Sequence, residues 1–247
     1  MSGKGKNAID MTGGSLWKNI LVFSLPLMMT QMLEVLFNLS DVAIAGKYAD
    51  YIALGAVGST ALLVSLFTGI LIGMGAGVNV RTAHQLGAEK TSGSSETVAR
   101  TVYSGLIVCL IIGIILCLVC NIFARPMLET LKTKDELIES AVLYLKIYAL
   151  GMPAMAVYNF GNGVLSACGE TKKPLVYLSI AGVLNVILNI FFVVVCKKAA
   201  DGVAIASVIA QYLSASMIMC HLLRRKDSCK LRLSNKYFDT SACGGVL

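Results

Sequence analysis

Residues 21–41 read LVFSLPLMMTQMLEVLFNLSD, an apolar run that carries four polar side chains at regular intervals. These are Gln31, Glu34, Asn38 and Asp41, separated by three, four and three residues. At about 100° per residue this spacing places all four on one side of a helix. A carboxylate at the bilayer centre costs about 2.5–3.5 kcal/mol, so it is rarely retained without a cavity or a partner. We interpret the stretch as a membrane helix with a hydrated, ion-handling side lined by these four residues. The open alternative is that Asp41 only caps the helix at the membrane surface while Glu34 pairs with a neighbour.

The composition predicts an all-α, polytopic membrane protein. The chain is 56% hydrophobic and 14% charged, with a mean hydropathy of +0.75, whereas soluble domains contain about 25% charged residues. Six stretches are long enough to cross about 30 Å of hydrocarbon. They are Trp17–Leu39, Ile52–Val80, Val102–Ala124, Ser140–Ser166, Leu175–Cys196 and Val203–Leu223. We therefore expect a short N-terminal segment over 1–16, a six-helix transmembrane lobe over 17–223 and a basic tail over 224–247.

The distribution of basic residues predicts the orientation. With the N-terminus in the cytoplasm, fourteen Lys and Arg residues lie inside and six outside, with Lys146 in the membrane. Under the positive-inside rule this bias predicts a multi-pass protein of the plasma membrane with both termini cytoplasmic. The bias also accounts for the net charge of +7, so the lipid bilayer is an expected partner and nucleic acid is not. Between the spans, we interpret residues 81–100 as a cytoplasmic loop with amphipathic ends and residues 125–139 as a short external helix.

The sequence contains no recognisable catalytic set. No Ser/His/Asp arrangement, P-loop or dinucleotide-binding glycine motif is present, so we do not expect an enzyme or an organic cofactor. The eight cysteines and two histidines lack the spacing of a metal site, and we interpret the cysteines as structural.

Other features inside the spans suggest packing or a polar interior. Gly69, Gly73 and Gly77 recur at every fourth position, which allows close approach of another helix but also matches the general abundance of glycine in membrane helices. Pro26 lies in mid-helix, where a kink is favoured. The polar candidates on later spans are Asn185, Asn189 and Ser207. Each alone is explained by ordinary interhelical hydrogen bonds, but with Asp41 they supply the oxygen ligands that a proton relay or a sodium ion would use.

At these residues the chain resembles the multidrug and toxic compound extrusion (MATE) transporters. The resemblance covers about residues 12–235 and includes Pro26, NLSD at 38–41, GETKKP at 169–174, LNVILN at 184–189 and GVAIAS at 202–207. It implies one six-helix lobe of a twelve-helix transporter that exports bulky, often cationic small molecules against proton or sodium entry.

Residue by residue, the resemblance places Asp41, Asn185, Asn189 and Ser207 in the polar network of the N-terminal lobe. It also makes Pro26 a candidate hinge. The coupling ion would be H⁺, or Na⁺ held by Asp41, Asn185 and Asn189, and no other metal is expected. Two positions depart from the family: Asn189 stands where an acidic residue is common, and Ser207 replaces a usual threonine. The site therefore has one carboxylate where many relatives have two.

The chain length matches one lobe only. After a basic stretch the sequence ends in TSACGGVL, which does not resemble the start of a seventh span. We therefore expect a truncated or frame-shifted product whose partner is a missing C-terminal lobe or a second copy of itself, and which is inactive alone. Two alternatives remain open: a structural membrane protein that does not transport, and a lipid-linked-oligosaccharide flippase of the same superfamily. The flippase would need more Arg and Lys in its cavity to hold phosphate.

Overall fold

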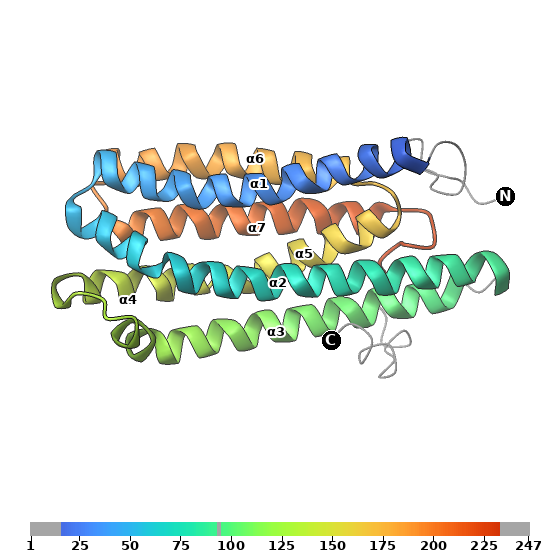
Figure 1. Cartoon of the computed structure of the whole chain (residues 1–247), viewed down its shortest axis with the longest axis horizontal. Coiled ribbons are helices and arrows are strands. Elements are labelled where there is room, and N and C mark those ends of the chain that lie inside the picture. The colour runs from blue at the N-terminus through green and yellow to red at the C-terminus, as the bar shows by residue number, and fades with distance from the viewer. Residues whose placement is uncertain (1–15, 93–94, 233–247) are drawn as a thin grey trace.

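The computed structural model describes residues 16–92 and 95–232, and within these ranges every regular element is helical (Figure 1). The elements are α1 (Leu16–Tyr48), α2 (Tyr51–Ser92), α3 (Ser95–Thr130), α4 (Asp135–Ala149), α5 (Met152–Ala167), α6 (Lys172–Ile190), the π-helical turn η1 (Phe191–Val195) and α7 (Ala200–Arg224). In lipid a helix satisfies its own backbone hydrogen bonds, which is why apolar stretches of this length take this form. The all-α prediction is confirmed.

The helices lie along the long axis of the molecule in a bundle (Figure 1). Helix α1 packs beside α6, α7 contacts both α6 and α5, and α2 packs against α5, α4 and α3. The interior contains large apolar side chains such as Leu71, Leu145, Phe160 and Ile218. The outer side of α1 exposes Leu21, Met28 and other large apolar residues. An apolar surface around an apolar interior is the pattern of a bundle that faces lipid.

Five helices are long and apolar enough to cross a membrane, and a bent pair makes a sixth candidate span. That pair is α4 and α5, which meet at an angle of 45°. Pro153 in the first turn of α5 explains the break, because its ring nitrogen cannot donate to the preceding turn. The predicted span Ser140–Ser166 therefore corresponds to this bent pair, in which two helices with a break between them take the place of one helix.

Two predicted connections are wrong, because the helices extend beyond their apolar segments. Helix α2 continues to Ser92 and α3 begins at Ser95, so most of the expected loop over 81–100 is helical. Helix α3 continues to Thr130 and α4 begins at Asp135, so residues 125–139 do not form a separate external helix. Hydropathy marks where lipid contact ends, while the backbone hydrogen bonds continue into the polar residues.

Glycines allow the backbones of α2 and α5 to lie close together. A Cβ atom on Gly75 would lie 2.7 Å from the carbonyl oxygen of Asn159, and one on Gly163 would collide with the carbonyl oxygen of Gly75. In contrast, a Cβ on Gly69 or Gly73 would meet no atom within 4 Å. Within the described residues, Gly69 and Gly73 therefore make no close helix contact, and approach of another chain to this ridge stays a prediction. The contact with α5 is formed by Gly75 on another side of α2.

A second contact region joins the helix ends near Glu170. Glu170 and Arg225 are each 6% exposed in their side chains, and they form an ion pair of 3.3 Å. Lys173 also pairs with Glu170 at 2.8 Å, and Arg225 donates from Nε to Asp227 at 2.8 Å. Ser228 donates to Glu89 of α2 at 2.6 Å. These contacts fasten the residues after α7 to the ends of α2 and α6.

A disulfide between Cys168 and Cys229 joins the same region. The interpretation of the cysteines as structural did not include this pairing. One cysteine ends α5 and the other follows α7, and they are 61 residues apart in sequence. Their proximity depends on the tertiary fold, so the sequence alone offered no signal for it.

The glycine contact predicts a matched pair of substitutions. We expect Gly75→Ala to destabilise the chain by about 1–3 kcal/mol, because the added methyl group must displace the α5 backbone. Gly73→Ala adds the same methyl group to open space and should leave stability unchanged or slightly higher. Thermal unfolding in detergent, followed by circular dichroism at 222 nm, measures both. Equal melting temperatures for the two variants would contradict the assigned contact.

The Glu170 ion pairs predict that the stability of the fold decreases at low pH. Burial raises the pKa of Glu170, but the hydrogen bond from Lys173 and the charge of Arg225 lower it more, so the net pKa lies below its usual value of 4.5. A lowered pKa stabilises the fold above the unfolded-state pKa, and this contribution is lost as the pH falls through the folded-state pKa.

We therefore expect Glu170→Gln to lower stability at pH 7 by about 1–3 kcal/mol, because Arg225 loses a buried partner but keeps Asp227. The difference from the parent should shrink as the pH falls below 4.5. The exposed Glu129→Gln variant is the control and should change stability little. Melting curves across this pH range test the prediction, and a pH-independent deficit would refute the electrostatic explanation.

Candidate functional site

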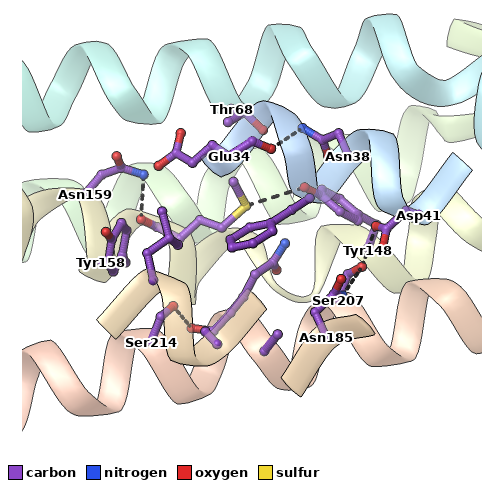
Figure 2. Close-up of a pocket in the computed structure, with 16 residues that line it drawn as sticks. Glu34, Asn38, Asp41, Thr68, Tyr148, Tyr158, Asn159, Asn185, Ser207 and Ser214 are labelled. Carbon is purple, nitrogen blue, oxygen red and sulfur yellow. Dashed lines mark hydrogen bonds between the residues drawn. The ribbon is translucent and has the colours of Figure 1, made fainter. Parts of the chain in front are cut away.

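Three helices bring one carboxylate, two amides and one hydroxyl together in the interior. Ser207 of α7 donates to Oδ2 of Asp41 on α1 at 2.7 Å, and Asn189 of α6 donates to Oδ1 of Asp41 at 2.7 Å. Asn185 donates to Ser207 at 3.1 Å, and its Oδ1 accepts from Asn189 at 3.2 Å. All four side chains are buried, and Asp41 is 3% exposed. The four predicted network residues thus lie together, and Figure 2 shows three of them, Asp41, Asn185 and Ser207.

Local packing positions this network. Asn185 and Asn189 are one helical turn apart on α6, so both amides face α1 and α7. A Cβ on Gly182 would collide with the ring of Phe37, so this glycine allows α1 to lie close to α6. The π-helical turn η1 begins two residues after Asn189. Such turns occur frequently at functional sites.

The hydrogen bonds define what Asp41 can do chemically. Both carboxylate oxygens act as acceptors, which is the pattern of the ionised form. Protonation would convert one oxygen into a donor, and Ser207 or Asn189 would then have to change its contact. Oδ1 of Asn189 is buried and has no hydrogen-bond partner. Rotation of this amide would turn Oδ1 towards Asp41, which would supply the oxygen ligands that a sodium ion needs.

The network lies at one end of a cavity that is partly open to the outside. The cavity is lined by Glu34, Phe37, Asn38, Asp41, Thr68, Tyr148, Met155, Tyr158, Asn159, Leu178, Ala181, Asn185, Ser207, Ala210, Gln211 and Ser214. Glu34 and Asn38 are thus in the predicted place. Asn38 also donates to the backbone oxygen of Glu34 at 3.2 Å (Figure 2).

Gln31 and Asn189 do not line this cavity. Gln31 is exposed on α1, so its predicted cavity-lining position is wrong. It lies about 80° around the helix from Asp41, at the edge of the polar stripe. Asn189 is fully buried behind Asp41 and reaches the cavity only through its hydrogen bonds. Sequence reasoning missed Tyr148, Tyr158 and Asn159, because isolated polar or aromatic residues in a span form no stripe.

Pro26 is buried within α1, which remains one helix from Leu16 to Tyr48. Its own carbonyl oxygen accepts a hydrogen bond from the Thr30 hydroxyl at 2.9 Å. Because proline lacks a backbone N–H, the helix has one fewer hydrogen bond at this point. The helix is therefore locally weaker about four turns before Asp41.

A family model described as MatE matches residues 26–191 of the chain. The chain belongs to the MatE family. The match includes the polar stripe of α1 and both asparagines of α6, so the resemblance to MATE transporters is confirmed. The chain is accordingly a multi-pass membrane protein of a family of multidrug transporters.

Named relatives agree with this assignment. The "Probable multidrug resistance protein YpnP" of Bacillus subtilis is 27% identical over 221 residues, which are 89% of this chain and 48% of that protein. The "Multidrug export protein MepA" of Staphylococcus saprophyticus is 22% identical over 222 residues, again 89% of this chain and 48% of that protein. The chain therefore spans about half the length of the curated relatives it matches.

Solved structures show the same fold. An outward-facing multidrug resistance MATE family transporter matches with a TM-score of 0.84 and 22% identity, over 99% of this chain and 53% of that chain. A MATE crystal structure in complex with MaD3S matches with a TM-score of 0.85 and 21% identity, over 99% of this chain and 54% of that chain. The MatE chain thus has the fold of about half of a MATE transporter, as predicted.

Proposed function

We propose that the chain is the ion-coupling lobe of a secondary active exporter of bulky cationic compounds. The observation that carries this proposal is the buried Asp41 carboxylate, which is hydrogen-bonded to α6 and α7 at the end of a cavity. The names of the relatives, which describe multidrug resistance and export, support the substrate class. No cofactor is needed beyond the coupling ion, H⁺ or Na⁺.

In this proposal, charge at Asp41 controls the contact between α1 and its neighbours. The ionised carboxylate holds Ser207 and Asn189, and a proton or a sodium ion competes with these contacts. Loss of one contact changes the relative stability of two helix arrangements, which is how a local charge shifts a two-state equilibrium. Export follows if one arrangement opens the cavity inward and the other outward.

Alternating access of this kind requires two halves that move around a central site. The chain has the length of one half, so we propose that a second lobe or a second copy completes the cavity wall. We also propose that the lobe lies in the plasma membrane with both termini in the cytoplasm, which the fourteen-to-six bias of basic residues supports. Within the described residues, no Lys or Arg lines the cavity. That lining does not favour the flippase alternative, whose substrate carries phosphate.

Asp41→Asn tests the coupling role. The amide keeps the shape of the side chain but cannot bind and release a proton, so ion-driven efflux of a cationic dye from vesicles carrying the two-lobe form should be abolished. Expression and melting temperature should remain close to those of the parent. The exposed Asp135→Asn variant is the control and should transport normally. Normal dye efflux by Asp41→Asn would remove Asp41 from the mechanism.

Pro26→Ala tests the proposed hinge. Restoring the backbone N–H should stiffen α1 and make its two halves tilt together. In the two-lobe form, we expect the maximal transport rate to fall more than the apparent affinity for the dye. Leu25→Ala changes an exposed neighbour on the same helix and serves as the control. Unchanged kinetics in Pro26→Ala would reduce this residue to a packing role.

The isolated chain should insert correctly without transporting. A green fluorescent protein fused after residue 247 should fluoresce, and alkaline phosphatase fused there should be inactive, because both report a cytoplasmic C-terminus. The purified monomer in proteoliposomes should show no ion-driven dye uptake, since one cavity wall is missing. Ion-coupled uptake by the monomer would disprove the need for a second half, whereas uptake only by a dimer would make the chain a half-transporter.

A further inference from the structure

The cavity contains a second carboxylate that the coupling network does not use. Glu34 lies on α1 seven residues before Asp41, which is about 10 Å along the helix axis. In Figure 2 its side chain extends towards Asn159 and Tyr158, at the other end of the drawn region from Asp41. The two acids therefore occupy different parts of one cavity.

The two carboxylates differ in the hydrogen bonds that their oxygens accept. Both oxygens of Asp41 accept hydrogen bonds from neighbouring helices. Oε2 of Glu34 is buried and accepts none. Among the donors of the cavity wall, Asn159 donates to the backbone oxygen of Met155 at 3.0 Å and Tyr158 donates to the backbone oxygen of Pro174 at 3.1 Å. The Thr68 hydroxyl is buried without a hydrogen-bond partner, and it does not bond to Glu34 either. Glu34 thus has acceptor capacity that the described part of the protein leaves unfilled.

The cavity provides no positive charge to balance Glu34. Among its lining residues, as far as the structure describes them, none is Lys, Arg or His. A buried carboxylate without a partner is costly, so it must take up either a proton or a cation from outside. In its ionised form, Glu34 gives this end of the cavity a preference for positively charged molecules.

The walls indicate what kind of cation fits. Phe37, Tyr148, Tyr158 and Met155 line the same cavity as Glu34. Aromatic faces attract organic cations, and a thioether is soft and adaptable. A small inorganic ion would instead need a cage of several oxygen ligands. The surroundings of Glu34 match a lipophilic organic cation better than a metal ion.

We propose that Glu34 and the aromatic wall form a subsite for the positive charge of the transported molecule, separate from the ion-coupling network at Asp41. The inference rests on the proposed function and assigns the two acids of α1 to different tasks. Glu34 selects the cargo by its charge, and Asp41 binds the coupling ion.

Equilibrium binding to the 247-residue chain in lipid nanodiscs tests the subsite without requiring transport. The probes are tetraphenylphosphonium, a lipophilic monovalent cation, and triphenylphosphine oxide, a neutral molecule of related shape, with binding to empty nanodiscs subtracted. We expect Glu34→Gln to weaken tetraphenylphosphonium binding about tenfold or more, because one unit charge in a partly desolvated site is removed. Binding of the neutral probe should not change.

Three variants serve as controls. Glu34→Asp keeps the charge and should retain most of the affinity. Asp41→Asn should lose less affinity for the cation than Glu34→Gln. Glu96→Gln alters an exposed residue that is paired with Arg100 on α3, and it should bind as the parent does. The proposal is overturned if the parent shows no saturable binding of the cation, or if Glu34→Gln binds it as tightly as the parent.

A second measurement covers the case in which Glu34→Gln fails to fold. Dicyclohexylcarbodiimide, an apolar reagent that modifies buried carboxyl groups, is applied to the parent, and the modified residues are identified by mass spectrometry. Tetraphenylphosphonium should protect Glu34, and the neutral probe should not; equal modification with both probes would overturn the subsite. If cation binding depends on Glu34 but no ion-driven export is found, only the proposed function fails. If export is intact and cation binding does not depend on Glu34, only the proposed subsite is refuted.

Discussion

The rest of the structure depends on how the carboxylate of Asp41 is accommodated in an apolar bundle. Its two oxygens are satisfied by donors from two other helices, so α1, α6 and α7 must meet at one point. Leaving a buried charge without such partners would cost several kcal/mol, roughly the size of a protein's whole net stability. The small residue Gly182 lets α1 approach α6 closely enough for these bonds. The hydrogen bonds at Asp41 and the packing of α1, α6 and α7 therefore depend on each other.

Most of this site could be predicted from the sequence, because polar residues in a lipid-like stretch need a reason to be there. The helical spacing of Glu34, Asn38 and Asp41 placed them on the cavity side. Spacing also put Asn185 and Asn189 on one side of their helix, but their place beside Asp41 and Ser207 was implied by the resemblance to MATE transporters. Gln31 was misplaced because a stripe that spans about 80° has residues at its edge, and spacing alone does not say which edge faces the interior.

The features that sequence did not predict depend on contacts between distant segments. Cys168 and Cys229 become neighbours only when the residues after α7 fold back over the helix ends. The role of Gly75 depends on which side of α2 faces α5, and that choice is made by the packing of the whole lobe. The helix ends were missed for another reason, since a polar helix beyond the membrane has no hydropathy signal.

The disulfide between Cys168 and Cys229 closes a covalent ring around α6 and α7. Two of the three helices that meet at Asp41 are parts of this ring when the bond is formed, and the bond then disfavours the unfolded state by about 4 kcal/mol in the loop-entropy description. On the cytoplasmic face proposed for this end of the bundle, the bond would form only under oxidising conditions. Helix α1 lies outside this ring, and only noncovalent contacts hold it against α6 and α7. Asp41 is therefore carried by the one member of the trio that can separate from the site without stretching the ring.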